Sequence, residues 1–326
     1  MRVSAETQAQ DYNGGPAADE SILLTVPTDA LGLRLDQVLA RLLPQFSRSR
    51  LQSWIEAGRV TVDARAATPK QRLKGGEAIV VLPLAAADAG VFEAQAIALS
   101  IVYEDAAIIV VDKPAGLVAH PAAGNWDGTL LNALLHYAPE LAEVPRAGIV
   151  HRLDKDTSGL LVVARTLEAQ TNLVRQMQAK SVKREYLALL SGYVGTPGVI
   201  DAALGRHPSQ RTRIAVLADS AAGAKPAITH YRVLRQLQRD GLAASLVECR
   251  LETGRTHQIR VHMQHLGLPI VGDQTYGRQP WRGWFPRQVL HALRLAITHP
   301  VSAAPMQWEA PLPADVSEFL DSLEEA

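Results

Sequence analysis

The chain has 326 residues, equal numbers of basic and acidic side chains (33 of each) and one cysteine, Cys249, which excludes a disulfide framework and paired-cysteine sites. No apolar run approaches the roughly 18 residues of a membrane-spanning helix, and residues 1–20 contain no apolar signal-peptide core. We therefore expect a cytoplasmic protein without membrane contact and, at about 150 residues per domain, with two domains.

The neutral total conceals a segregation of charge along the chain. Residues 29–83 hold nine Lys and Arg against five Asp and Glu, and residues 141–300 hold 22 against 11. The acids gather instead before Pro27, in residues 84–105 and after Val301. A basic surface on a chain of zero net charge is typical of proteins that bind phosphates of nucleic acids. Any single run of charge is also compatible with an ordinary solvated face.

The first part of the chain predicts a polar tail and then a small basic domain. Residues 1–24 are rich in Gln, Asn, Gly and acids, as in disordered tails. Residues 35–42 place apolar side chains on one helix face, a second helix is predicted at 47–58, and short strands follow at 60–63 and 78–82. Basic side chains gather around the second helix and between the strands: Arg48, Arg50, Arg59, Lys70, Arg72 and Lys74.

An alanine-rich stretch divides the chain. Residues 85–95 are predicted to be a linker, which leaves residues 25–84 as the first domain and 96–326 as the second. In the second domain, buried apolar runs mix with alternating ones, and helix signals lie between them, with Thr166 as one N-cap. This pattern predicts an α+β fold with a mixed, largely antiparallel sheet and flanking helices. A stretch rich in Pro, Arg and Gly is predicted to form a surface insertion that carries Trp281, Trp284 and Phe285.

The most informative stretch is HRLDKDTSG at 151–159, which lies between two apolar runs. Its last three residues predict a turn into a buried strand at 160–164, so Arg152 and Asp154 are expected on an extended loop that feeds the middle of a sheet. A carboxylate held there is removed from water and needs a neighbouring cation to stabilise its charge. Catalytic groups are often found at such positions. A surface turn with Asp–Arg ion pairs has the same pattern, so the spacing alone leaves both interpretations open.

Other chemistries find little support in the spacing of polar residues. Asp154 and Asp156 are too close on one segment to flank a sugar as a glycosidase pair does. His257, His262 and His265 lack the HExxH pattern or a cysteine partner, so no metal site is predicted. The chain has no phosphate-binding GxxxxGK loop, no GxSxG motif and no dinucleotide fingerprint, so no cofactor is expected.

The motif HRLDKDTSG resembles the signature of the RluA family of RNA pseudouridine synthases. The similarity runs roughly from Leu31 to Pro313 and includes KREYLALL (183–190), GRHPSQRTRIAV (205–216), KPAITHYRV (225–233), RLETGRTHQIRVHM (250–263) and PIVGDQTYG (269–277). It implies the pseudouridine synthase fold for the second domain, preceded by a small S4-like RNA-binding domain whose basic side chains contact the RNA backbone. The alternative for the first domain is a cap that only covers the catalytic domain.

The resemblance implies that Asp154 is the catalytic residue, either as a nucleophile on the sugar or as a base at C2′. A cation must keep this carboxylate ionised, and Arg260 is the expected ion-pair partner because it lies at the inner end of its motif. Arg255 is the competing candidate, and Ile259 is expected to pack beside the site.

The target base must leave its stack to be reached by the enzyme. By resemblance, Arg152 would enter the space that the base leaves, and Tyr186 would stack on the flipped uracil. Without the resemblance, Tyr186 reads more simply as a core aromatic residue. Further RNA contacts are expected from a basic loop that contains Arg206, Arg211 and Arg213.

Within the family, the chain is most similar to enzymes of the large ribosomal subunit. This implies a monomer that isomerises uridines of 23S rRNA, in the loop of helix 69, on the RNA or on a precursor particle of the large subunit. One alternative is the same chemistry at another rRNA site or on transfer RNA. A second is a non-catalytic RNA-binding factor for ribosome assembly that keeps the fold.

Overall fold

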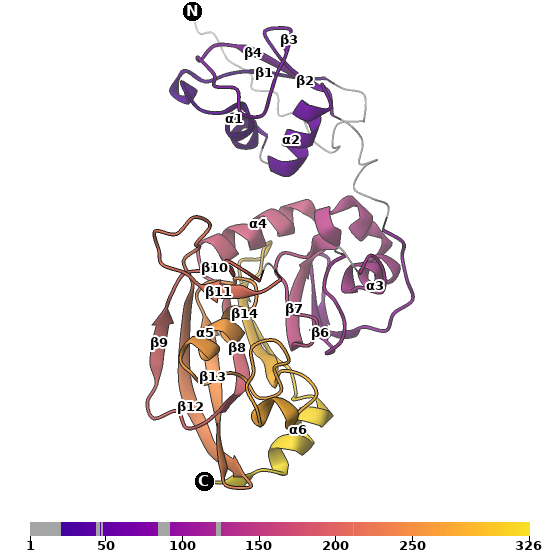
Figure 1. Cartoon of the computed structure of the whole chain (residues 1–326). Coiled ribbons are helices and arrows are strands. Elements are labelled where there is room, and N and C mark those ends of the chain that lie inside the picture. The colour runs from indigo at the N-terminus through magenta and orange to yellow at the C-terminus, as the bar shows by residue number, and fades with distance from the viewer. Residues whose placement is uncertain (1–20, 44–45, 47, 84–91, 122–124, 211) are drawn as a thin grey trace, which may run out of the picture. The chain divides into compact units, whose positions relative to one another are not determined.

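The computed structural model describes residues 21–43, 46, 48–83, 92–121, 125–210 and 212–326, without the side chains of 48–50. The chain divides into two compact units, of which the first ends at residue 91 and the second is Phe92–Ala326 (Figure 1). In the described ranges, no helix is long and apolar enough to cross a membrane.

The first unit combines a four-stranded sheet with two helices. The sheet has the strand order β1-β4-β2-β3, and all of its described pairs are antiparallel. Its elements are β1 (Ile22–Thr25), η1 (Thr28–Ala30), α1 (Leu35–Leu42), α2 (Arg48–Glu56), β2 (Val60–Val62), β3 (Arg65–Ala66) and β4 (Ala78–Val81). The predicted disordered tail, 1–24, therefore extends too far, because residues 22–24 pair with β4; residues 1–20 lie outside the described chain.

The two helices of this unit are joined by an apolar seam and by one buried carboxylate. The apolar face predicted for α1 is buried and packs in one cluster with Leu51 and Trp54 of α2. Asp36 of α1, which is fully buried, accepts hydrogen bonds from Arg34 at 3.0 and 2.8 Å and from Gln52 of α2 at 2.6 Å. The unit has a core of its own, as an independent domain requires.

The second unit is built on one large mixed sheet. Its strand order is β16-β12-β13-β8-β14-β7-β6-β5, with β15 paired to β14 and β9 paired to β12. The β14–β7 pair is parallel and the other described pairs are antiparallel, which confirms the predicted α+β fold. The strands are β5 (Ser100–Glu104), β6 (Ile108–Lys113), β7 (Ser158–Ala164), β8 (Lys183–Ser191), β9 (Gly198–Asp201), β12 (Ile228–Arg239), β13 (Leu242–Leu251), β14 (Leu290–Thr298), β15 (Pro305–Glu309) and β16 (Glu324–Glu325).

Helices and a small hairpin surround this sheet, and in Figure 1 α4 and α6 lie toward opposite ends of it. Thr166 accepts a hydrogen bond from the backbone N–H of Ala169, which confirms it as the N-cap of α4. The surrounding elements are α3 (Leu130–Tyr137), η2 (Pro139–Glu143), η3 (Pro145–Gly148), α4 (Leu167–Gln178), β10 (Leu204–Arg206), β11 (Ile214–Val216), α5 (Gln258–His265), η4 (Trp281–Gly283) and α6 (Ala314–Asp321).

The strand β7 begins inside the HRLDKDTSG motif, at Ser158, so the predicted turn at 157–159 gives way to strand two residues before its expected end, and β7 lies in the interior of the sheet. β7 is buried along its whole length and runs between β14 and β6. A strand covered on both faces needs a continuous apolar run, which is what the sequence LLVVA supplies. The loop before β7 therefore starts from a rigid support, as a catalytic loop requires.

Two sequence predictions fail in this unit because long-range packing overrides local composition. The predicted linker ends too late. Phe92 packs against the main core, and the backbone carbonyl oxygen of Glu93 accepts a hydrogen bond of 2.8 Å from the side chain of Asn132 of α3. Residues 85–91 lie outside the described chain. The predicted surface insertion is also wrong, because Phe285 is buried against Phe319 of α6, with ring centroids 4.9 Å apart. Trp281 donates to the carbonyl oxygen of Ala243 at 2.8 Å.

Candidate active site

A buried lysine holds the loop that carries Asp154. The ammonium group of Lys113, at the end of β6, donates to three backbone carbonyl oxygens, those of Pro114 at 2.8 Å, Leu117 at 2.9 Å and Lys155 at 3.0 Å. Burial lowers the pKa of Lys113 to about 8, although nearby carboxylates including Asp154 oppose the shift. The three acceptors use all the protons of the ammonium group. Lys113 therefore fixes the path of the loop next to Asp154.

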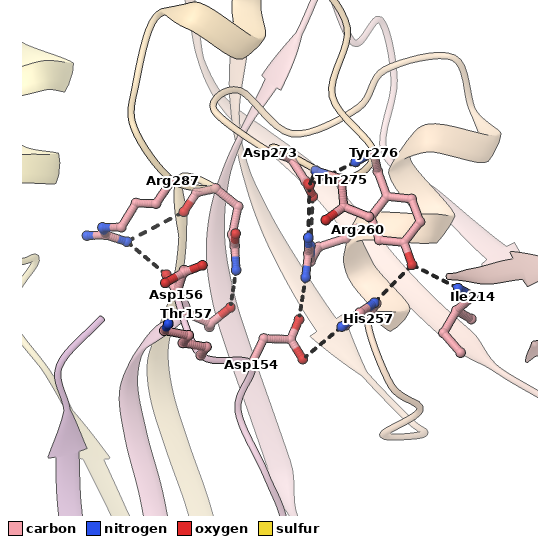
Figure 2. Close-up of polar contacts among 12 residues, drawn as sticks. Asp154, Asp156, Thr157, Ile214, His257, Arg260, Asp273, Thr275, Tyr276 and Arg287 are labelled. Atoms are coloured by element: carbon pink, nitrogen blue, oxygen red, sulfur yellow. Dashed lines mark hydrogen bonds and ion pairs between the residues drawn. The ribbon is translucent and has the colours of Figure 1, made fainter. Parts of the chain in front are cut away.

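The other side of the loop is held by the segment that directly precedes β14. Arg287 donates to the backbone carbonyl oxygen of Asp156 at 3.2 Å, and Gln288 donates to the hydroxyl oxygen of Thr157 at 3.3 Å (Figure 2). Contacts from the end of β6 and from the segment before β14 leave the backbone around Asp154 little freedom. A catalytic side chain gains from such support, because its geometry must be set before the substrate arrives.

Asp154 forms an ion pair with an arginine of α5. Arg260 Nη1 lies 3.2 Å from Asp154 Oδ2, while Nε and Nη2 of the same guanidinium donate to Asp273 at 2.7 and 2.9 Å (Figure 2). Arg260 is 6% exposed and the side chain of Asp154 is 16% exposed. Burial disfavours the charge of Arg260, but the bonds to Asp273 and the charges of both carboxylates raise its pKa. The guanidinium of Arg260 thus places a positive charge directly beside the carboxylate of Asp154.

Asp273 is itself fixed by its own backbone. Its carboxylate accepts the backbone N–H groups of Thr275 and Tyr276 at 2.8 and 2.9 Å. Burial alone would raise the pKa of Asp273, but the hydrogen bonds and charge of Arg260 outweigh it and lower the pKa. Asp273 thus aims the guanidinium of Arg260 at Asp154, a role that the sequence analysis does not assign to any residue.

His257 also faces Asp154, and its role was missed in the sequence because only metal binding was considered for it. It precedes α5 with φ 54° and places Nε2 3.9 Å from Asp154 Oδ1. Nδ1 lies 2.9 Å from the hydroxyl of Tyr276, which accepts the backbone N–H of Ile214 at 2.9 Å. Burial lowers the pKa of His257. His257 therefore connects Asp154, through the hydroxyl of Tyr276, to the backbone of β11.

Asp154, His257 and Arg260 line a cleft of about 1010 Å³ whose lining residues all belong to the second unit. Arg152 is an exposed residue of the loop, and Tyr186 of β8 and Ile259 of α5 are buried residues of the wall. Arg255 also lines the cleft, but its Nε donates to the carbonyl oxygen of Pro226 at 3.1 Å. The structure therefore pairs Asp154 with Arg260 and not with Arg255.

The residues predicted to contact RNA have different positions. Arg213 lies near the site, with its guanidinium 5.3 Å from the centroid of the Tyr276 ring, and Arg206 is an exposed residue of β10. In the first unit, Arg59 and Arg72 donate to backbone carbonyl oxygens at 3.3 and 2.7 Å. Lys70 and Lys74 are exposed. Arg211 and the side chains of Arg48 and Arg50 lie outside the described part, and the RNA contacts of the whole set stay a prediction.

The described residues contain no group of three or more His, Cys, Asp or Glu that could hold a metal ion. His262, one of the three histidines considered for metal binding, instead contacts Thr229 and the carbonyl oxygen of Ala202 at 2.9 and 3.0 Å. Burial raises the pKa of Cys249, so its thiol stays protonated and unreactive.

Comparisons with known proteins agree with this arrangement of fold and site. The family model described as RNA pseudouridylate synthase matches residues 107–265, and the S4 domain model matches residues 33–79. Among solved structures, "Human RNA Pseudouridylate Synthase Domain Containing 1" is 30% identical with a TM-score of 0.58, and the match covers 71% of this chain and 90% of that one. The chain belongs to the RNA pseudouridylate synthase family, as the resemblance predicts, and is an isomerase with an S4 domain.

The most similar curated relatives share one name. "Ribosomal large subunit pseudouridine synthase D" of Nitrosomonas europaea is 54% identical, over 99% of this chain and 96% of the relative. The protein of that name from Pseudomonas aeruginosa is 51% identical, over 91% of this chain and 94% of the relative. The similarity thus spans the S4 domain and the catalytic domain together.

Proposed function

We propose that this chain converts uridines of the large-subunit ribosomal RNA to pseudouridine, with Asp154 as the catalytic residue. The observation that carries the proposal is the Asp154–Arg260–Asp273 chain of ion pairs at the cleft, where one carboxylate remains partly exposed and the other is fully buried. The names of the relatives support the choice of RNA.

The reaction conserves all atoms and needs no outside electrons. The bond between N1 of uracil and C1′ of ribose breaks, the base rotates, C5 bonds to C1′, and the C5 proton is lost while N1 gains one. A carboxylate can begin this sequence by attack at C1′ or by removal of the C2′ proton. Asp154 presents such a carboxylate at the cleft, beside the positive charge of Arg260.

We propose that the loop of helix 69 in 23S rRNA is the target. Unpaired bases of a loop leave their stack at lower cost than paired ones, and the basic S4 domain can hold the adjoining stem by its phosphates. The test is chemical mapping of pseudouridine in a helix 69 hairpin and in free transfer RNA after incubation with the pure protein. We expect conversion of the hairpin alone. Modification of transfer RNA or of another ribosomal helix would contradict the target, and no modification of any RNA would favour a non-catalytic assembly factor.

Tyr186→Leu is expected to lower the rate of pseudouridine formation by about 5- to 150-fold, the range that corresponds to the stacking of one base on an aromatic ring. Leu keeps the buried position apolar but fills less space than Tyr, so thermal unfolding of the variant is measured to separate a lower rate from a loss of folded protein. Tyr186→Phe keeps the ring and is the matched control, which should retain most of the activity. Single-turnover rates measure both variants. Equal reductions in both would assign the role to the hydroxyl group and not to stacking.

Removal of residues 1–91 is expected to weaken RNA binding and to reduce its dependence on salt. Residues 29–83 of the first unit hold nine Lys and Arg against five Asp and Glu. The slope of log K against log salt should fall by about 0.7–0.9 for each phosphate that the shortened protein no longer binds. The second unit should still unfold cooperatively, because its sheet and cores are complete without the first. Fluorescence titrations at several salt concentrations measure the slope. An unchanged slope would show that the first unit acts only as a cap.

A further inference from the structure

The wall of the cleft contains a buried arginine that the proposed chemistry does not use. Arg184 lies on β8, where its backbone pairs with Leu295 of β14, and it is 7% exposed. It lines the cleft together with Tyr186, two residues further along the same strand. Side chains two apart on a strand point to the same face, about 7 Å apart. Arg184 therefore faces the space into which the target nucleotide would fit.

The guanidinium of Arg184 is not paired with any described residue. No hydrogen bond or ion pair joins it to the described part of the chain, and its Nε is buried without a partner. The other buried cations of the site differ: Lys113 has three carbonyl acceptors and Arg260 has two carboxylates. An isolated buried charge costs several kcal/mol, so proteins normally pair it. An anion from outside the chain can supply the missing partner.

A glycine leaves room for this guanidinium. A Cβ atom at Gly254, on the loop before α5, would lie 2.5 Å from Arg184 Nη1. The φ of Gly254 is not in the left-handed region, so the backbone does not require glycine there. Gly254 also lines the cleft. The close approach of this loop to the guanidinium therefore depends on the missing side chain and not on the turn.

We propose that Arg184 binds a backbone phosphate of the RNA next to the nucleotide that enters the cleft, an inference that rests on the proposed function. A phosphodiester carries the charge that a buried guanidinium lacks, and its oxygens match the paired donors of arginine. The separation of Arg184 from Tyr186 is on the scale of one nucleotide, so one residue would hold the backbone while the other stacks on the base. A neutral carbonyl oxygen of uracil could accept the same hydrogen bonds, but it would leave the charge uncompensated.

The test replaces single phosphates of the RNA hairpin with neutral methylphosphonates and measures binding to protein with and without Arg184→Gln. Asp154→Asn is present in all proteins, so that turnover does not change the RNA. With Arg184 present, one replacement near the target uridine should weaken binding about 10- to 100-fold, the effect of one hydrogen bond between charged groups. In the protein with Arg184→Gln, the same methylphosphonate replacement should not weaken RNA binding any further. Equal weakening in both proteins at every phosphate would overturn the inference, and so would binding to the protein with Arg184 that no single replacement weakens.

Two further variants keep the result independent of folding. Arg255→Gln removes a charge from the same cleft and should leave the sensitivity to the single phosphate intact. Gly254→Ala keeps the charge of Arg184 but displaces its guanidinium, so the single methylphosphonate should no longer weaken binding. This variant gives the answer if Arg184→Gln proves unstable in thermal unfolding. Retained sensitivity in Gly254→Ala would overturn the inference.

The proposed function and this inference fail in different ways. A hairpin that the wild-type protein does not convert contradicts the proposed target, and the same phosphate comparison is then made on the RNA that it converts. A hairpin that is converted, with a phosphate pattern that Arg184→Gln leaves unchanged, contradicts the inference alone.

Discussion

Asp154→Asn is expected to abolish pseudouridine formation, with a fall in the single-turnover rate of about 10⁴-fold or more, while RNA affinity stays close to that of the wild type. The substitution keeps the size of the side chain and removes only the carboxylate, whose contribution as a proton acceptor alone can reach about 10⁴-fold. The amide oxygen of Asn can still accept the hydrogen bond of 3.2 Å from Arg260, so the cleft should keep its shape. Rates and dissociation constants are measured on the same RNA hairpin.

Asp156→Asn is the matched control for this experiment. Asp156 lies two residues away on the same loop, and its backbone carbonyl oxygen, not its carboxylate, accepts the hydrogen bond from Arg287. The control should keep most of the activity. A wild-type rate for Asp154→Asn would overturn the assignment of the catalytic residue, and equal reductions in both variants would point to the electrostatics of the loop as a whole.

Arg260→Met is expected to abolish activity and to lower the free energy of unfolding by about 3–5 kcal/mol, the range for breaking a buried ion pair. The reason is that Asp273, which is fully buried, would lose its only positively charged partner among the described residues. Activity falls as well because the carboxylate of Asp154 loses the hydrogen bond and the positive charge of Arg260 that hold it in place. Chemical denaturation measures the stability and single-turnover assays measure the rate.

A double variant separates the structural role of Arg260 from its catalytic one. In Arg260→Met with Asp273→Asn, no buried carboxylate is left unpaired, and the Asn side chain can still accept the backbone N–H groups of Thr275 and Tyr276. We expect the double variant to regain much of the stability and none of the activity. Recovery of both would show that Arg260 acts only through the fold.

The parts of the structure that follow from local sequence were predictable. The apolar run after HRLDKDTSG forms the buried strand β7, and Thr166 caps α4, because both signals depend only on neighbouring residues. The partner of Asp154 was found through the family motif, and the spacing by itself did not separate Arg260 from Arg255. An ion pair between residues 106 positions apart depends on how the sheet folds.

The errors and omissions share a cause in long-range contacts. The local sequence places Phe285 in a surface insertion, but in the fold it packs against Phe319 of α6. The local sequence places Phe92 in a linker, but it packs against the main core. The missing partner of Arg184 has no signature in the sequence, because an arginine on an alternating strand is normally expected at the surface. The contacts of His257 with Tyr276 and Asp154 likewise depend on the left-handed backbone conformation of His257 itself, directly before α5.

The most direct test of the central claim is to map pseudouridines in ribosomal and transfer RNA from cells in which the gene is deleted. We predict that pseudouridine disappears from large-subunit ribosomal RNA at neighbouring positions of the helix 69 loop, and that transfer RNA is unchanged. A plasmid copy of the wild-type gene should restore the modification, and a copy with Asp154→Asn should not. An unchanged pattern in large-subunit ribosomal RNA, or restoration by the Asp154→Asn copy, would contradict the account.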